Sequence, residues 1–195
     1  MPSTRDRLIT ATNESFRRRG FHGTSMQSVV TSADATIGSL YHFFPAGKTE
    51  LAEATVRETG RAYGELIGMF LADGRSVGAA IGAFFDGAAE VLVETEFLDV
   101  CPIGTVAREI AGEHEGIRAA AAEVFRQWAD ILVTALAANG VDPDDARAAS
   151  VMVICLFEGA VLLARTARDP EVMRTAGRSA AGLVDHVVPA ATTRP

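Results

Sequence analysis

The sequence predicts an all-α fold. Apolar residues recur along almost the whole chain with the three- and four-residue spacing of amphipathic helices, and glycine, proline or short polar clusters separate the helical segments. With 195 residues, of which 48% are apolar, the chain is long enough to bury a real core. We expect a small three-helix domain at residues 1–47 and a larger helical domain at residues 48–195.

Charge is divided unevenly between these two parts. The net charge is −7, but residues 1–50 contain six Lys or Arg and four Asp or Glu, a balance of +2. The rest of the chain carries −9. A polyanionic partner would therefore meet the N-terminal quarter of the chain.

The cysteine and hydropathy patterns favour a cytoplasmic protein without a metal or other cofactor. Cys101 and Cys155 lie far apart, and neither has a cysteine or histidine at zinc-ligand spacing. The N-terminus lacks the apolar core of a signal peptide. The longest apolar run, residues 151–164, is interrupted by Glu158 and is too short to span a bilayer.

Two helices are predicted in the first part of the small domain. The first begins after Ser3 or Thr4 and ends at Gly20, after three arginines that suit a helix C-terminus. Thr24 and Gln27 then fit a capping box at the start of the second helix.

A tight turn and a third short helix follow. Asp34 and Ala35 suit the turn, Thr36 can cap the next helix, and Leu40 and Phe44 supply its inward face. Two short helices joined by such a turn form a helix-turn-helix, whose second helix enters the major groove of DNA. Further helices are predicted at about 48–70, 76–94, from 102, at 117–138, and at 145–168 and 171–188.

The N-terminal half of the third helix is expected to read base edges, through Thr36, Ile37, Gly38 and Ser39. A glycine destabilises a helix by about 1 kcal/mol relative to alanine, so the presence of Gly38 inside a short helix needs an explanation. Close approach of the backbone to DNA is one reason. Packing of Gly38 against the first helix is the alternative.

Candidate contacts to phosphate flank these residues, and they are Thr24, Ser25, Tyr41, His42 and Lys48. Alternatively, Tyr41 is a half-buried core aromatic, His42 merely faces solvent, and Thr24 is only a cap.

Lys48 is the only lysine in the chain, and it stands at a helix start. The helix dipole disfavours a cation there, and a phosphate would reverse that effect. Glu50 and Glu53 are the alternative partners for its ammonium group.

Two sets of residues carry a family resemblance. The first set is Gly20-Phe21, Thr24-Ser25-Met26, Thr36 to Pro45, Lys48 and Leu51. It resembles the DNA-binding domain of TetR-type transcriptional regulators. The second set is Cys101 to Gly104, Trp128, Glu158-Gly159-Ala160 and Leu162 to Arg165. It resembles the LmrA/YxaF-like branch of that family.

The resemblance implies a homodimeric repressor that a small-molecule inducer releases from its DNA operator. It implies base contacts by Thr36 to Ser39 and phosphate contacts by Tyr41, His42 and Lys48. It also implies that the last two helices form a four-helix bundle across the dimer. Asp34 departs from the family, in which glycine is usual in the turn, but aspartate tolerates left-handed backbone.

The last two helices have apolar faces that suit such a dimer, although a monomer could bury them internally. Gly159 and Ala160 would allow close approach. The two expected stripes are Val151, Ile154, Phe157, Val161 and Leu162, and Ala180, Ala181, Leu183, Val184 and Val187. A twofold dimer predicts a pseudo-palindromic operator.

A ligand cavity is expected among the central helices, lined mainly by apolar and aromatic residues. Each aromatic residue could equally be ordinary core. A largely aromatic pocket indicates a planar hydrophobic inducer. The candidate lining residues are Phe84, Phe85, Cys101, Phe125, Trp128, Cys155 and Glu158.

Two other functions compete with a repressor. An all-α enzyme finds no support, because the four histidines are scattered and no nucleophile elbow or phosphate loop is present. Solvated charge explains residues 113–115 better than a metal site does. A helical ligand-binding or adaptor protein that has lost DNA binding stays open, because the N-terminal charge is small and Asp34 is acidic.

Overall fold

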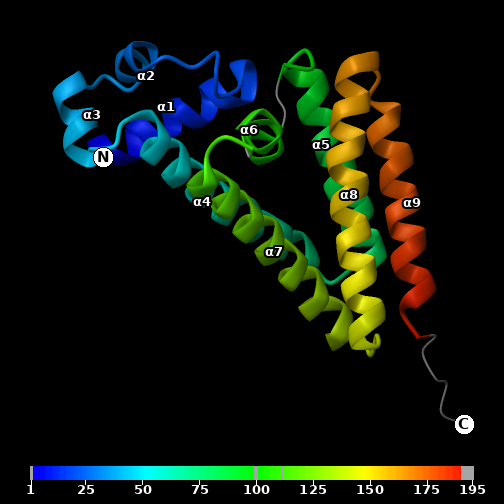
Figure 1. Ribbon diagram of the computed structural model, residues 1–195. Coiled ribbons are helices and arrows are strands. Elements are labelled where there is room, and N and C mark those ends of the chain that lie inside the picture. Colours follow the sequence, from blue (N-terminus) through cyan, green and yellow to red (C-terminus); the bar gives the residue numbers. More distant parts are fainter. Residues whose placement is uncertain (1, 99–100, 111, 190–195) are drawn as a thin grey trace, which may run out of the picture. The chain divides into compact units, whose positions relative to one another are not determined.

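The computed structural model describes residues 2–98, 101–110 and 112–189, and in these ranges the regular elements are all helices (Figure 1). The all-α prediction is confirmed. The helices are α1 (Thr4–Arg19), α2 (Met26–Ser32), α3 (Ile37–Phe43), α4 (Lys48–Leu71), α5 (Val77–Glu94), α6 (Pro102–Ile110), α7 (Glu115–Ala138), α8 (Pro143–Ala167) and α9 (Glu171–Val187).

Local caps explain where α1 begins and ends. The Ser3 hydroxyl accepts a hydrogen bond from the Asp6 amide at 3.1 Å, and the Asp6 carboxylate accepts one from the Ser3 amide at 3.1 Å. At the other end Gly20 takes a φ of 69°, a left-handed value that suits glycine. The predicted bounds of α1 are confirmed.

The start of α2 differs from the prediction. Its cap is Ser25, whose hydroxyl accepts the Ser28 amide at 3.1 Å. Thr24 is 3% exposed, and its hydroxyl donates to the Gly20 carbonyl at 2.7 Å. The capping box at Thr24 was therefore wrong by one residue. Both residue types are good caps, and only packing decides which hydroxyl faces inward.

The chain divides into two compact units. The first is Met1–Ala62 with Asp99–Val124, and the second is Tyr63–Leu98 with Phe125–Pro195. Helices α4 and α7 each run from one unit into the other. The domain boundary expected after residue 47 stays a prediction.

The N-terminal part of the first unit is a small helical core. Helix α1 packs against α2 and α3, and these two pack against each other. Leu8, Val29, Leu40, Phe44 and Leu51 are all almost fully buried there. Leu40 and Phe44 thus point inward as predicted, so the opposite side of α3 faces outward.

The second unit is built around α9, which packs along both α5 and α8 (Figure 1). Gly177 makes the crossing with α5 possible. A Cβ atom at this position would lie 2.6 Å from the Cβ atom of Phe85, closer than two carbon atoms can pack.

The outward face of α8 is apolar, but its residues are only partly those predicted. Val161, Ala180 and Val184 are buried inside the unit. Val151 and Leu162 are exposed as expected, together with Met152, Cys155, Gly159 and Leu163. The predicted stripes are therefore partly wrong, because apolar residues occur on several sides of α8 and periodicity cannot tell inside from outside.

By length and composition alone α8 would be able to cross a membrane, contrary to the expectation from its interrupted apolar run. A third of its most apolar window is buried inside the structure. A single helix of this kind is weak evidence for a membrane span, because core helices of water-soluble proteins pass the same test.

Replacing Gly177 by alanine should destabilise the protein. We expect the overpacking against Phe85 to lower the free energy of unfolding by about 1–2 kcal/mol, measured by urea denaturation. Gly68→Ala is the matched control, because a Cβ atom there meets no described residue within 4 Å. The control should gain up to about 1 kcal/mol from helix propensity. Equal gains in both variants would contradict the close crossing.

Candidate functional site

The turn between α2 and α3 has the geometry of a helix-turn-helix. Asp34 takes a φ of 47°, so it adopts the left-handed backbone expected of this position. The Ala35 amide donates to the Val30 carbonyl at 2.9 Å and thereby ties the turn to the end of α2. Thr36 caps α3 by accepting the Ser39 amide at 3.1 Å, as predicted.

Arg7 on α1 holds this turn in place, and the sequence analysis missed it. Its Nε donates to the Ala33 carbonyl at 2.9 Å, and one terminal nitrogen donates to the Asp34 carbonyl at 3.2 Å. The guanidinium group thus joins α1 to the C-terminal end of α2, where carbonyls lack helical partners. No sequence pattern reveals this role, because the contact spans more than twenty residues.

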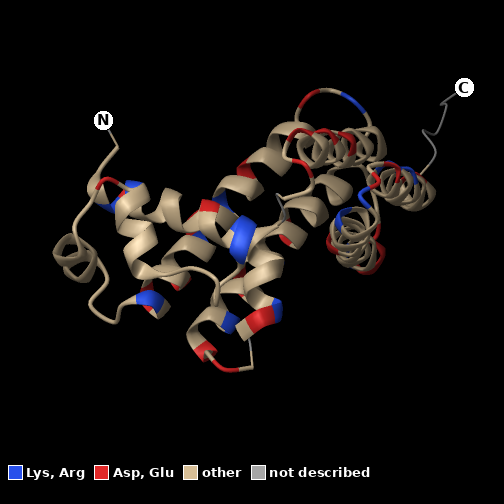
Figure 2. Ribbon diagram, turned by 90° about the horizontal axis from the view of Figure 1, so that it is seen from above, with Lys and Arg blue, Asp and Glu red and all other residues tan. Residues whose placement is uncertain are grey.

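Helix α3 presents an uncharged outer surface. It contains no Lys, Arg, Asp or Glu, and neither does α2, so neither helix carries red or blue in Figure 2. Ile37 is 44% exposed and Tyr41 is 52% exposed, and His42 is exposed beside them. Tyr41 is not among the buried core residues, which disfavours the alternative of a half-buried core aromatic.

Gly38 lies on this outer surface without a packing reason for being glycine. Outside its own helix backbone and chain neighbours, a Cβ atom there meets only one described atom within 4 Å, the Thr36 Oγ1 at 3.7 Å. That is an ordinary contact distance. The alternative that Gly38 packs against the first helix is therefore wrong.

The two hydroxyl groups next to Gly38 engage each other. Thr36 Oγ1 and Ser39 Oγ lie 2.9 Å apart, a hydrogen bond in which either atom can be the donor. One hydroxyl proton of the pair therefore stays available for an outside acceptor. Thr36 is exposed and Ser39 is partly exposed, so both can be reached from outside.

The phosphate candidates are divided by burial. Ser25 is exposed at the start of α2, whereas the Thr24 hydroxyl also lies 2.8 Å from the Ser15 hydroxyl and is enclosed by the protein. We therefore correct Thr24 from a DNA contact to a structural residue. Packing of α1 on this segment, which periodicity does not report, buries it.

Lys48 packs onto an aromatic ring. Its Nζ lies 4.3 Å from the centroid of the Phe21 ring, a cation–π contact. Burial lowers the pKa of this ammonium group, and the Glu109 carboxylate opposes that shift. The alternative partners are engaged elsewhere, since Glu50 accepts the Ala46 amide at 2.8 Å and Glu53 pairs with Arg57 at 3.5 Å.

Glu109 on α6 is the second residue that the sequence analysis missed. Its carboxylate accepts the His22 amide at 3.1 Å, just after α1. A side chain at Gly20 would overlap this carboxylate. Nearby, the centroids of the Phe21 and His114 rings lie 5.8 Å apart. Helix α6 thus contacts the segment between α1 and α2.

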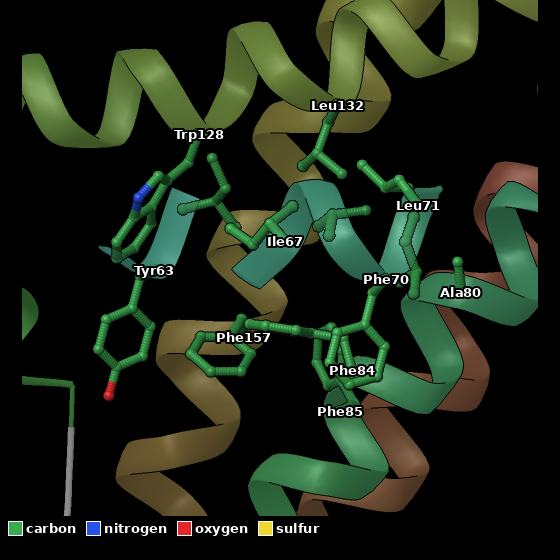
Figure 3. Close-up of a pocket in the computed structure, with 13 residues that line it drawn as sticks. Tyr63, Ile67, Phe70, Leu71, Ala80, Phe84, Phe85, Trp128, Leu132 and Phe157 are labelled. Atoms are coloured by element: carbon green, nitrogen blue, oxygen red, sulfur yellow. The ribbon is translucent and has the colours of Figure 1, made fainter. Parts of the chain in front are cut away.

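A second candidate site is an apolar pocket within the second unit (Figure 3). Helices α4, α5, α7 and α8 contribute its lining. Its aromatic residues are Tyr63, Phe70, Phe84, Phe85, Trp128 and Phe157. Its aliphatic residues are Ile67, Leu71, Ala80, Ile81, Leu132, Val153 and Ile154.

The pocket holds little free volume. Its cavity volume is about 40 Å³, whereas pockets for drug-sized ligands hold roughly 300–1,000 Å³. Aromatic side chains fill much of the space, and Figure 3 shows Phe84, Phe85 and Phe157 close together in it. The Phe84 and Phe157 ring centroids lie 5.2 Å apart, and those of Phe85 and Phe157 lie 5.3 Å apart.

Three of the seven predicted ligand residues, Phe84, Phe85 and Trp128, line this pocket. Phe125 is not a lining residue, but its ring centroid lies 5.5 Å from that of Trp128. Cys155 is exposed on α8, and Glu158 on the same helix is not among the lining residues.

Cys101 is corrected to a helix cap. Its buried sulfur accepts the Gly104 amide at 3.4 Å at the start of α6, in the first unit. The missed residues on α4 carry the ordinary periodicity of a helix core, so no sequence signal distinguishes them as pocket lining.

The cluster at residues 113–115 shows no metal-binding arrangement. Glu115 instead pairs with Arg118, which donates to it at 2.7 Å. This pair lowers the pKa of Glu115 and raises that of Arg118. Within the described ranges no group of three His, Cys, Asp or Glu side chains could hold a metal ion.

Comparison with known proteins matches both halves of the chain. Residues 8–55 match the family model of bacterial regulatory proteins of the tetR family. Residues 78–179 match the C-terminal domain of LmrA/YxaF-like transcriptional regulators. The second match alone covers more than half of the chain.

Relatives are similar over most of their length. The helix-turn-helix (HTH)-type transcriptional regulator YxaF of Bacillus subtilis is 30% identical over 85% of this chain and 87% of its own. An HTH-type transcriptional regulator of Mycobacterium tuberculosis is 32% identical over 87% of this chain and 88% of its own.

A solved structure agrees in fold. The crystal structure of a TetR transcriptional regulator from Legionella pneumophila superposes with a TM-score of 0.80 at 20% identity, covering 97% of this chain and 99% of that one. The chain therefore belongs to the TetR family, with a C-terminal domain of the LmrA/YxaF-like type, and is a helix-turn-helix transcriptional regulator rather than an enzyme.

Proposed function

We propose that this regulator is a one-component repressor whose α3 lies in the major groove of a pseudo-palindromic operator. Gly38 carries the proposal. It weakens a short helix, and neither its backbone conformation nor its packing requires glycine. DNA would explain the glycine, because the absence of a side chain at Gly38 lets the backbone of α3 approach the base edges closely.

Contacts around Gly38 divide into two kinds. Thr36, Ile37 and Ser39 face base edges beside it, and Ser25, Tyr41 and His42 reach phosphates from exposed positions. Lys48 adds a phosphate contact when its side chain turns away from Phe21. Such a regulator acts in the cytoplasm, where bacterial DNA lies.

Gly38→Ala separates the folding and binding roles of this position. We expect the free energy of unfolding of the variant to rise by up to about 1 kcal/mol, because alanine has a higher helix propensity than glycine. We also expect at least a tenfold weaker operator affinity, because the added methyl group holds the helix off the bases. The assay is a gel shift on duplexes selected from a randomised pool, across a range of salt concentrations.

Gly68→Ala is again the control, with a similar gain in stability and unchanged affinity. Unchanged operator affinity in Gly38→Ala would remove the main support for the proposal. If the protein enriches no duplex from the pool, it is instead a helical ligand-binding or adaptor protein that has lost DNA binding.

We further propose that two copies pair through the apolar outer face of α8. Exposed leucine, valine and methionine side chains line this face, and Leu163 is 60% exposed. Gly159 has no described atom within 4 Å of a Cβ built there, so a second helix can approach its backbone closely. Burial of this apolar face favours a second copy, and twofold symmetry then demands a palindromic operator.

Leu163→Glu should convert the dimer to a monomer, because it buries a charge in that interface. Light scattering after size-exclusion chromatography measures the mass. Leu66→Glu is the control, an equally drastic change at an exposed position on α4 that should leave the dimer intact. Cys155 offers a second readout, since a maleimide should label it faster in the monomer. A wild-type monomer would rule out the interface.

The inducer we propose is small, planar and hydrophobic. The pocket lining contains no charged side chain, and its only polar side-chain groups are the Tyr63 hydroxyl and the Trp128 indole nitrogen. A charged ligand would lose its hydration there without compensation. Because the cavity is so small, the ligand enters only if the aromatic side chains that line it move apart. That rearrangement is what we propose releases the operator.

Trp128 is the only tryptophan, so its fluorescence reports on the pocket directly. Among planar hydrophobic compounds, those that raise the melting temperature should also change this fluorescence and weaken operator binding. Phe157→Ala should alter ligand affinity at least fivefold, while Met69→Ala, outside the lining and 70% exposed, should not. Thermal shifts without any fluorescence change would place the ligand elsewhere.

A further inference from the structure

We propose that Ile37 reads the C5 methyl group of a pyrimidine, normally thymine, in each operator half-site. This inference rests on the proposed DNA-binding function and deepens it. Ile37 is the first residue of α3, and nearly half of its side chain is exposed. The exposed part of the Ile37 side chain therefore adds little to the stability of the fold. For folding alone, a polar residue at this position would serve as well.

Ile37 belongs to a small apolar flank of α3. Tyr41 follows four residues later, so the two side chains lie on the same side of the helix, and Tyr41 is half exposed as well. Leu40 and Phe44 fill the inward side. The exposed flank is thus continuous with the surface of α3 that is proposed to face DNA.

The neighbours of Ile37 leave it one chemical role. The Thr36 and Ser39 hydroxyls supply the hydrogen-bonding groups, and they are already joined to each other at 2.9 Å. Gly38 has no side chain. Ile37 is therefore the one apolar side chain among the four base-reading residues, and it has nothing with which to satisfy a base donor or acceptor.

The major groove offers one apolar group to such a side chain. Among the four bases only thymine displays a methyl group there, and every other edge atom is a donor, an acceptor or a ring C–H. Placing a polar base edge against Ile37 would strip it of water without a hydrogen bond. Gly38 beside it lets the helix come close enough for a short branched side chain to touch the methyl group.

The test deletes the methyl group from the DNA instead of the protein. A duplex selected from a randomised pool is resynthesised with each thymine in turn replaced by deoxyuridine, which removes only the C5 methyl. We expect wild-type protein to lose about fourfold in affinity at one thymine per half-site, the effect of uncovering one buried methyl-sized group. We expect Ile37→Ala to bind the thymine and deoxyuridine duplexes equally.

Two arms sharpen this result. Replacing the same thymine by cytosine weakens wild-type binding, and 5-methylcytosine recovers part of that loss, because it restores the methyl group alone. Ser39→Ala, on the other side of α3, keeps the deoxyuridine penalty whatever its overall affinity. Circular dichroism confirms that Ile37→Ala folds, as expected for an exposed position and a better helix former.

Two outcomes would overturn the inference while leaving the proposed function intact. Either no deoxyuridine position weakens wild-type binding, or Ile37→Ala shows the same penalty as wild type at the same thymine. Failure to enrich any duplex from the pool is a different result, because it removes DNA binding itself.

Discussion

The orientation of α3 depends on the contact between α1 and the helix-turn-helix turn. Helices of seven residues are too short to be stable alone, so tertiary contacts must hold both α2 and α3. Leu40 and Phe44 supply the apolar part of that support, and Arg7 supplies the polar part by binding the Ala33 and Asp34 carbonyls. Because the buried side of α3 is fixed in this way, Ile37, Gly38 and Tyr41 are left outside together.

Asp34 is easier to understand in this setting. A left-handed aspartate costs more than glycine, but its backbone carbonyl accepts a hydrogen bond from Arg7. The same guanidinium group places a positive charge next to the acidic Asp34. The departure from the usual glycine therefore leaves the turn geometry intact.

The pocket and the DNA-binding helices are linked through the chain itself. Helix α4 begins at Lys48, beside Phe21, and ends at Phe70 and Leu71, which line the pocket. Under the proposed mechanism, an inducer that moves the aromatic rings apart would also displace the part of the wall that Phe70 and Leu71 form. The small cavity makes such movement necessary, since close-packed interiors have no spare volume for a ligand of ordinary size.

Much of this protein follows from the sequence by itself. Helix caps and breakers at Ser3, Gly20, Thr36 and Asp142 are local signals, and they predicted the helices because their energetics involve only neighbouring residues. The exposed, glycine-containing α3 was predictable for the same reason. It follows from the spacing of Leu40 and Phe44.

Only the tertiary structure decided which equivalent residues face which way. Threonine and serine are both good capping residue types, and packing buries Thr24 while Ser25 stays exposed and caps α2. The middle of helix α8 has apolar residues on both its pocket side and its outer side, so the sequence pattern does not distinguish the two sides. Arg7 and Glu109 act on segments distant in sequence, and such contacts leave no local signal because they arise only when the helices pack.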